Sequence, residues 1–418
     1  MAGVKRYSAA ILLKDSVSPD KVMKIQIPII AAIFVLSGLG ALTDKALAQN
    51  WMPLTNAPGG LWSVASSADG SKLVVGSAYN GPIYTSTDSG ATWLTNTAPT
   101  TFWTSVASSA DGTGLVAAAG HPFQGSLYTS PDAGATWTAN NVPNEFWESV
   151  ASSADGVKLA AVIASGPIYT SADSGLNWGF NNNAPNTYWT CIASSADGSK
   201  LAATWALNSG GGIFTSADSG TTWVPSAVPS VNWYAIASSV DGTKLVAVSP
   251  GALIYTSTNS GTSWSSNSLP QAPTAYWYCV ASSADGTKLA VGSYYGSGIY
   301  VSTNSGLSWF NSGAPGVNWN SIAASADGNQ FVAVAEGGNA YVWRTPPSVE
   351  LNLSATSNSL ELFWLVPSTT FVLQENSDLT TTNWVTLTNT PTLNLSNLNN
   401  EVVLSPSNSS SFFRLIAQ

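Results

Sequence analysis

The sequence predicts an all-β protein: a seven-bladed β-propeller closed by an N-terminal strand, followed by a small C-terminal β-sandwich-like domain. Two observations support this prediction. A unit of about 43 residues occurs seven times, and each unit reads as four short strands separated by turn residues. The composition agrees with a packed fold, since 44% of the 418 residues are hydrophobic and only 8% are charged. Such a chain is not intrinsically disordered.

The repeat is marked by two strings of residues. The first is Ser-Ser-Ala-Asp-Gly or a near copy, which we read as a turn, and its aspartates are Asp69, Asp111, Asp155, Asp197, Asp241, Asp285 and Asp327. Lysines that follow five of these turns are interpreted as solvated side chains. The second string has the form Ser-x-Asp-x-Gly-x-Thr-Trp, as in the run from Ser86 to Trp93, and follows the first six copies.

The second unit illustrates the expected strands. They cover residues 103–109, 115–119 and 127–130, and a fourth strand begins at Trp137. The seventh unit ends near Trp343 without its fourth strand, whereas the run beginning at Trp51 resembles the fourth-strand run beginning at Trp93. We therefore expect the N-terminal strand to complete the last blade and remove an exposed sheet edge, so that residues 51–345 form the propeller.

Residues 1–48 read as a targeting segment. Lys24 precedes an apolar run over residues 25–42, and Ala46-Leu47-Ala48 supplies a small-x-small cleavage site. This order predicts a secretory signal peptide cleaved after Ala48, with Met23 as an alternative start. A retained membrane anchor is the other interpretation, because about 18 apolar residues can just span a bilayer. With cleavage, we expect a secreted, periplasmic or cell-surface protein without stable membrane insertion.

Pro346 and Pro347 mark a boundary after which the repeat is lost. Strand-like runs separated by Ser, Thr and Asn turns occupy residues 360–364, 371–374, 384–387, 401–404 and 412–415. They predict a small β-sandwich-like module over residues 349–418. The module resembles C-terminal modules of secreted proteins from Verrucomicrobia-type bacteria, and this resemblance implies a role in attachment or spacing.

The second string resembles the Asp-box of the sialidase-like, or BNR-repeat, propellers. That superfamily includes photosystem II assembly factors, sortilin-type receptors and some xyloglucan hydrolases, and its box is the turn between the third and fourth strands of a blade. The box position is occupied by Asp88, Asp132, Asp173, Asp218, Asn259 and Asn304. Since Asn keeps the hydrogen-bond acceptor and loses the charge, we expect these residues to be structural and to hold no metal.

Aromatic residues enter the inner strands at the rim opposite these turns. We interpret eight of them as candidate binding residues: Trp103, Trp147, Trp189, Trp233, Trp277, Trp319, Tyr188 and Tyr276. A ring of aromatic side chains at a channel mouth can stack on sugar rings or contact apolar ligands. The alternative interpretation is packing between neighbouring blades.

Support for catalysis is weak. The candidates are Glu145, Glu148, Glu336 and His121, which fall at or near the same rim. Glycoside hydrolysis needs two carboxyl groups about 5–9.5 Å apart, and nothing in the spacing of these glutamates favours such a pair. Sialidases hold the substrate carboxylate with three arginines, whereas the chain after residue 48 contains two, so a true sialidase is excluded.

We therefore expect an exported, monomeric, non-catalytic binding or scaffold propeller without a cofactor, whose ligand is a glycan or a protein on the aromatic rim. The alternative is a glycoside hydrolase of the sialidase-like superfamily that uses Glu145, Glu148 or Glu336. Nucleic acid is not an expected partner, because 13 basic residues face 22 acidic ones. Cys191 and Cys279 are interpreted as free thiols, with a disulfide bridge as the alternative.

Overall fold

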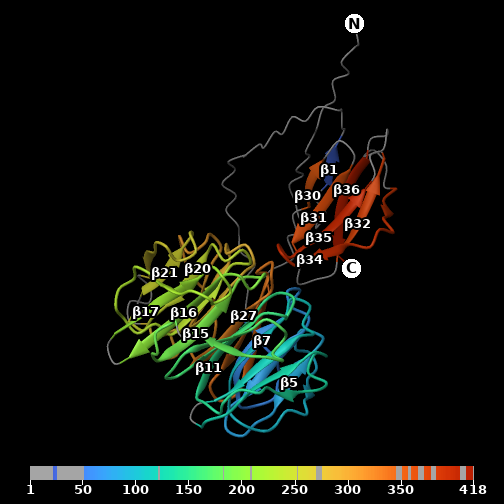
Figure 1. The fold of residues 1–418 in the computed structure, drawn as a ribbon. Coiled ribbons are helices and arrows are strands. Elements are labelled where there is room, and N and C mark those ends of the chain that lie inside the picture. Colours follow the sequence, from blue (N-terminus) through green and yellow to red (C-terminus); the bar gives the residue numbers. More distant parts are fainter. Residues whose placement is uncertain are drawn as a thin grey trace. The chain divides into compact units, whose positions relative to one another are not determined.

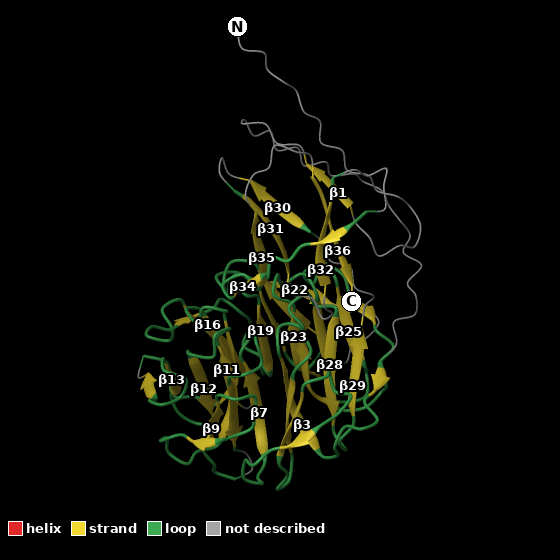
Figure 2. Ribbon diagram, turned by 90° about the vertical axis from the view of Figure 1, so that its right-hand side faces the viewer, coloured by secondary structure: helices red, strands yellow, loops and turns green. Residues whose placement is uncertain are grey.

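The structure of the protein is a computed structural model (Figure 1). It describes residues 22–25, 51–120, 123–181, 183–207, 210–251, 253–269, 275–344, 351–355, 359–365, 371–377, 383–404 and 411–417. These segments form strands, turns and loops and contain no helix, so the all-β prediction is confirmed (Figure 2). Accordingly, none of them supplies a helix that could cross a membrane. The chain divides into two compact units, one made almost entirely of residues 49–345 and the other mostly of residues from Pro346 onward.

Strands in the described part of residues 51–344 form seven four-stranded antiparallel sheets, numbered here in chain order. Sheet 1 contains β3 (Leu61–Ser66), β4 (Leu73–Ser77), β5 (Ile83–Ser86) and β6 (Leu94–Thr95). Sheet 2 contains β7 (Trp103–Ser108), β8 (Leu115–Ala119), β9 (Leu127–Ser130) and β10 (Thr138–Ala139). Sheet 3 contains β11 (Trp147–Ser152), β12 (Leu159–Ile163), β13 (Ile168–Ser171) and β14 (Gly179–Asn181). Sheet 4 contains β15 (Trp189–Ser194), β16 (Leu201–Leu207), β17 (Gly210–Ser216) and β18 (Val224–Pro225). Sheet 5 contains β19 (Ala235–Ser238), β20 (Leu245–Val248), β21 (Leu253–Ser257) and β22 (Ser265–Ser268). Sheet 6 contains β23 (Trp277–Ser282), β24 (Leu289–Ser293), β25 (Ile299–Ser302) and β26 (Phe310–Asn311).

Sheet 7 joins the two ends of this unit. It contains β27 (Trp319–Ala324), β28 (Gln330–Ala335), β29 (Ala340–Arg344) and, as its fourth strand, β2 (Met52–Pro53). Strand β2 runs antiparallel to β29, and the indole N–H of buried Trp51 donates to Ser312 Oγ over 2.7 Å. The N-terminal strand therefore covers the edge that sheet 7 would otherwise expose.

A closed cycle of main-chain hydrogen bonds links all seven sheets. Each donor is the third residue of a Ser-Ser-Ala-Asp-Gly turn, and each acceptor is the carbonyl of the equivalent residue in the next sheet, over 2.7 or 2.8 Å. We call this cycle the alanine ring; it runs through Ala68, Ala110, Ala154, Ala196, Val240, Ala284, Ala326 and back to Ala68. The repeated turn thus joins neighbouring sheets as well as shaping its own hairpin.

The lysines that follow these turns are not simply solvated, which corrects the sequence interpretation. The ammonium groups of Lys72, Lys200 and Lys244 each donate to the main-chain oxygen of the turn aspartate in the next sheet over 2.8 Å. Sheet 7 has Gln330 at this position, and its amide donates to Gly70 O over 2.7 Å. These side chains join neighbouring sheets from the outside of the turns.

The box turns between the third and fourth strands are held by their own side chains. Asp88 Oδ1 accepts hydrogen bonds from the Ser86 hydroxyl and the Thr92 N–H, each over 2.8 Å. The Thr92 hydroxyl donates to the other carboxylate oxygen over 2.6 Å and is the main cause of the lowered pKa of Asp88. Asn259 keeps the same acceptor role toward Ser263 N–H. The carboxylates and amides at these positions form intramolecular bonds that define the turn.

The second unit contains two four-stranded sheets. One is formed by β30 (Asn352–Ala355), β31 (Leu360–Leu365), β35 (Asn399–Leu404) and β34 (Thr392–Asn394), and the other by β1 (Val22–Ile25), β36 (Ser411–Ala417), β32 (Phe371–Asn376) and β33 (Val385–Thr386). Leu362 and Trp364 of the first sheet share one buried core with Phe413 and Leu415 of the second. Apart from β1, the predicted signal peptide lies outside the described residues and stays a prediction.

Candidate functional site

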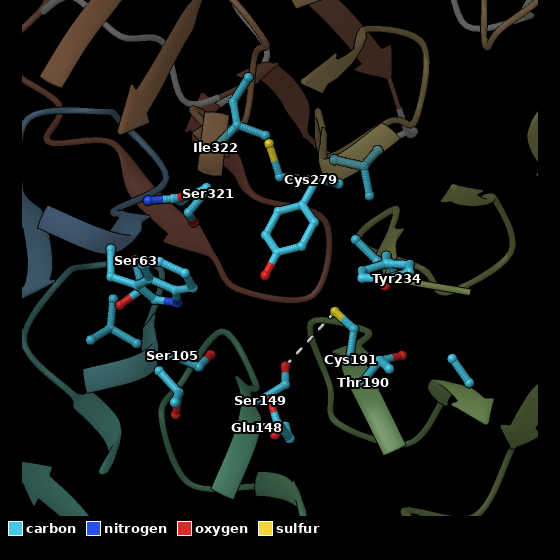
Figure 3. Close-up of a pocket in the computed structure, with 18 of the residues that line it drawn as sticks. Ser63, Ser105, Glu148, Ser149, Thr190, Cys191, Tyr234, Cys279, Ser321 and Ile322 are labelled. Carbon is cyan, nitrogen blue, oxygen red and sulfur yellow. Dashed lines mark hydrogen bonds between the residues drawn. The ribbon is translucent and has the colours of Figure 1, made fainter. Parts of the chain in front are cut away.

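A cavity of about 730 Å³ lies among the inner strands of the seven sheets (Figure 3). Every sheet contributes lining residues, from Ser63 in sheet 1 to Ser321 in sheet 7. Figure 3 shows the labelled side chains surrounding the cavity in chain order, with Glu148 and Ser149 across it from Ser321. The cavity is therefore the central space of the ring, and its lining is set by equivalent positions of the repeat.

A β-bulge at the start of the inner strand in six of the seven sheets shapes this lining. In β11 the register shifts between Trp147 and Ser149, so Glu148 is an extra residue without a paired partner. The same shift occurs in the inner strands of sheets 1, 2, 4, 6 and 7. In sheet 5 the equivalent residue, Tyr234, directly precedes β19 and donates its N–H to Val248 O. Bulges of this kind re-aim side chains and are common next to functional sites.

We call the seven equivalent residues the bulge ring. All of them line the cavity: Trp62, Thr104, Glu148, Thr190, Tyr234, Tyr278 and Asn320. Their chemistry differs from sheet to sheet, although the residues around them repeat. The variation therefore lies where a ligand would meet the protein, while the repeated residues maintain the fold.

The residues directly after the bulge ring line the cavity with small side chains, chiefly serines. Their hydroxyls are used to join sheets, as in the bonds from Val150 N–H to Ser105 Oγ and from Ile192 N–H to Ser149 Oγ. Cys191 and Cys279 occupy this level and are free thiols. Burial raises the pKa of the Cys191 thiol and that of Cys279, the latter to about 12, so both stay protonated and unreactive near neutral pH.

The six tryptophans predicted to bind a ligand lie in the packed core instead. Trp103, Trp147, Trp189, Trp233, Trp277 and Trp319 are all 0% exposed. Their indole groups pack between neighbouring sheets, and that of Trp189 donates its N–H to Gly166 O over 3.0 Å. A ligand cannot stack on rings that present no surface, so the binding prediction is wrong for these residues and the packing interpretation applies.

The two tyrosines of the same prediction lie elsewhere. Tyr188 is 36% exposed and lines the cavity. Tyr276 is half-buried, is not among the described lining residues, and donates from its hydroxyl to Tyr234 Oη over 2.8 Å. Tyr276 therefore supports a residue of the bulge ring, whereas Tyr188 is available for direct contact.

The structure does not bring the catalytic candidates together in the cavity. Glu148 lines it, whereas Glu145 and Glu336 are absent from the described lining. Glu145 forms a main-chain bridge with Gly125, and Glu336 accepts hydrogen bonds from the Tyr294 hydroxyl and the Asn318 amide. His121 lies outside the described residues. A pair of carboxyl groups for hydrolysis is not assembled among the described cavity residues.

Glu148 is the one described lining residue with a carboxylate, and its environment is unusual. It is half-buried, and no described group donates a hydrogen bond to it or forms an ion pair with it. Burial raises the pKa of its carboxyl group from 4.5 to about 8. A titratable group held in this way at the centre of a cavity is a candidate functional residue.

Exposed aromatic side chains surround this end of the ring, where the inner strands begin. Tyr79 in the β4–β5 loop is 78% exposed, and Tyr295 in the β24–β25 loop is 67% exposed. Tyr79 packs edge-on against Phe102, which packs against Trp62 of the bulge ring. Tyr295 contacts Tyr276 with ring centroids 5.0 Å apart. We call the exposed residues of this end, including Phe123, Phe146 and Tyr188, the aromatic rim.

Sequence reasoning missed most of the bulge ring as site residues. Trp62, Thr104, Thr190, Tyr234, Tyr278 and Asn320 were not among the expected binding residues. The available signal is variation: each inner strand repeats an apolar residue, usually Trp, followed by one changing residue and then a Ser-Val-Ala-Ser-like run. Only the bulge, which the sequence does not reveal, shows that the changing residue faces the cavity.

Comparisons with solved structures identify the fold. YCF48 from Cyanidioschyzon merolae superposes with a TM-score of 0.55 at 16% identity, covering 70% of this chain and 98% of that one. YCF48 bound to D1 peptide gives 0.55 at 18% identity, covering 72% and 97%. Kuenenia stuttgartiensis hydrazine synthase gives 0.59 at 14% identity, covering 73% and 99%. No family model and no curated protein matches the sequence. These similarities show that the chain has the β-propeller fold.

Proposed function

We propose that this protein is an exported, non-catalytic, seven-bladed propeller that binds a segment of a partner protein at the aromatic rim and in the cavity below it. The β-sandwich-like module attaches or spaces the propeller. The observation that carries the proposal is the cavity lining, in which seven equivalent positions hold five different kinds of side chain, next to exposed aromatic residues.

Two features support a protein ligand. Tyrosine and tryptophan are enriched at protein interfaces because they combine a large apolar surface with a polar group, and the rim and bulge ring together contain five tyrosines and Trp62. One structure with the same fold is described as YCF48 bound to D1 peptide. We transfer to this chain only the ability of such a ring to bind a peptide.

The cavity chemistry does not favour the hydrolase alternative. Hydrolysis of a glycosidic bond needs an acid and a second carboxylate flanking the substrate. Glu148 has the raised pKa of a general acid, but no second carboxylate belongs to the described lining. Binding without turnover is the activity that one isolated carboxylate among hydroxyl and aromatic groups best supports.

The proposal is tested by selecting peptides from a random library on the full chain and measuring their affinities by calorimetry. Replacing Tyr79 and Tyr295 with Ser should weaken the selected peptides at least tenfold. The matched control replaces Leu176 and Leu307, which are 77% and 83% exposed in box turns at the opposite rim. Equal losses in both variants would contradict the proposed rim.

A glycan array and a reducing-sugar assay test the other functions in parallel. Binding of glycans with no selected peptide would replace the protein ligand by a carbohydrate. Release of sugar by the wild type, lost in Glu148→Gln, would show a hydrolase. Export is tested separately by sequencing the N-terminus of the secreted protein, which we expect to begin at Gln49.

A further inference from the structure

We infer that the central cavity binds an ammonium group, such as a lysine side chain, which Glu148 meets as counter-ion and which Asn320 and the cavity aromatic rings help to hold. This inference deepens the proposed binding function and rests on it, because it assigns the chemical class of the ligand in that cavity. It is argued from four observations: charge, missing partners, aromatic surface and the position of Asn320.

The first observation is an acidic group without a basic partner. Glu148 is the only carboxylic acid of the described lining, which contains no Lys, Arg or His. A carboxylate taken out of water loses hydration that a counter-ion or hydrogen-bond donors must replace. A cationic ligand would supply what the described protein groups do not.

The second observation is the absence of internal donors to this carboxylate. The aspartates of the box turns accept several hydrogen bonds each, as Asp88 does from Ser86 and Thr92. Those bonds lower the pKa of Asp88, whereas burial raises that of Glu148. The protein therefore uses its box carboxylates structurally and leaves the Glu148 carboxylate unused.

The third observation is aromatic surface around the same space. Trp62, Tyr188, Tyr234 and Tyr278 line the cavity, and the rings of Tyr234 and Tyr278 have centroids 5.4 Å apart. After burial, the charge of Glu148 is the next cause that raises the pKa values of Tyr188 and Tyr278, so both phenols lie near it. Aromatic faces attract ammonium groups through their negative quadrupole.

The fourth observation is Asn320. Its side chain is 7% exposed and lines the cavity, and neither its amide nitrogen nor its amide oxygen has a hydrogen-bond partner. Leaving a buried amide unpaired is unfavourable, so a ligand that pairs with it removes that penalty. Asn320 and Glu148 line the same cavity, so both side chains belong to the surface that a bound ligand would meet.

Binding of a cation must compete with the proton on Glu148. Burial raises the pKa values of Tyr188, Tyr278, Cys191 and Cys279, so these lining groups remain neutral between pH 5 and 8. Tyr79 and Tyr234 are the other phenols of the described lining. Below the pKa of Glu148, the affinity for an ammonium ligand should therefore fall about tenfold for each pH unit.

The experiment titrates the full chain with N-acetyl-lysine methylamide and with its uncharged analogue N-acetyl-norleucine methylamide at pH 6, 7 and 8. We expect the wild type to prefer the lysine analogue at least tenfold at pH 8 and to lose that preference toward pH 6. Glu148→Gln should abolish both the preference and its pH dependence. Asn320→Leu should weaken the lysine analogue several-fold without changing the pH dependence.

Glu336→Gln is the matched control, because this carboxylate lies at the same end of the ring but is not among the described cavity residues. Equal affinity of the wild type for both analogues, a flat pH profile, or equal losses in Glu148→Gln and Glu336→Gln would each overturn the inference. The wild-type pH profile tests it even if a variant fails to fold. If library peptides bind at the rim without a preference for lysine, this inference fails while the proposed function stands.

Discussion

The ammonium group of Lys244 donates a hydrogen bond to the main-chain oxygen of Asp285 over 2.8 Å, and this bond joins sheets 5 and 6. The lysine stem lies across Gly286, where a Cβ atom would be 2.8 Å from Lys244 Cδ. Gly286 also has a φ of 65°, which favours glycine. The Asp-Gly pair is therefore fixed by the neighbouring sheet as well as by its own turn.

Lys244→Met should keep the packing of the stem on Gly286 and lose the hydrogen bond. We expect the free energy of unfolding to fall by about 1 kcal/mol, because the bond is charge-assisted but exposed. Lys244→Gln is the control, since Gln330 makes the equivalent bond in sheet 7. Denaturant unfolding of both variants measures the difference, and equal stability of Met and Gln variants would contradict a role for the bond.

Asn259 provides a second test, of the box turns. Asn259→Ala removes three hydrogen bonds, with the Ser257 hydroxyl, the Ser263 N–H and the Ser263 hydroxyl. We expect a loss of about 1–2 kcal/mol in thermal or denaturant unfolding. Asn259→Asp should stay near the wild type, because four other boxes use Asp at this position. If Asn259→Asp were strongly destabilised, the charge of the side chain, and not its hydrogen bonds, would determine the stability of this turn.

Trp189 and Tyr188 are adjacent in sequence but differ in environment. Trp189→Ala should lower the free energy of unfolding by about 3–5 kcal/mol, because it opens a cavity in the core between sheets. Tyr188→Ala should leave unfolding nearly unchanged and weaken the selected peptides, since this ring is partly exposed at the cavity. A fall in melting temperature for Tyr188→Ala, with none for Trp189→Ala, would contradict the assignment of Trp189 to the core and Tyr188 to ligand contact.

Glu148 predicts a pH dependence of stability in a window of its own. Its folded pKa is raised to about 8, so its contribution to stability is complete below pH 4 and is lost as the pH rises toward 8. We expect the wild type to lose up to about 4 kcal/mol over this range, at about 1.4 kcal/mol for each pH unit between the two pKa values, and Glu148→Gln to lose much less. Unfolding curves at pH 5 and 8 provide the measurement, and parallel slopes in the two proteins would contradict it.

The turn aspartates, Asp88 in a box turn and Asp197 in a Ser-Ser-Ala-Asp-Gly turn, act in the opposite direction and at lower pH. Hydrogen bonds lower the pKa of Asp88, and those from Ser195 and Ser199 lower that of Asp197 to about 2 despite its partial burial. Their contribution is present above pH 4 and is lost as the pH falls through the folded pKa values. The two effects therefore occur in separate pH ranges, so titration of the aspartates does not contribute to the stability change measured for Glu148.

The repeat made the fold predictable, because the hydrogen-bonded turns and core residues must recur in every sheet. Trp103 and its equivalents recur for that reason, and recurrence was misread as a ring of ligand contacts. A residue that recurs in every repeat is more often part of the packed core than of a binding site. The changing residues, such as Thr104 and Asn320, carry the site, but simple alternation along a strand does not show which of them faces the cavity.

The lysines were misread for a related reason. Charged residues in turns are usually solvated, and nothing in the local sequence shows that Lys72 reaches the carbonyl of Asp111, 39 residues away. Similarly, burial raises the pKa of Glu148, and the cavity that this residue lines is formed by side chains from all seven sheets. Contacts between repeats depend on how neighbouring sheets are placed in the ring, and the sequence of a single repeat does not reveal that placement.

The alanine ring has no first or last member, because each of its seven residues both gives and receives one bond. Linear repeat arrays need specialised terminal units that shield the ends of the array, whereas a closed ring needs no such capping unit. Every unit can therefore change the bulge-ring residue that it contributes to the cavity lining. An ancestral duplication could in this way yield many different binding specificities by substitutions at seven positions, without rebuilding the scaffold.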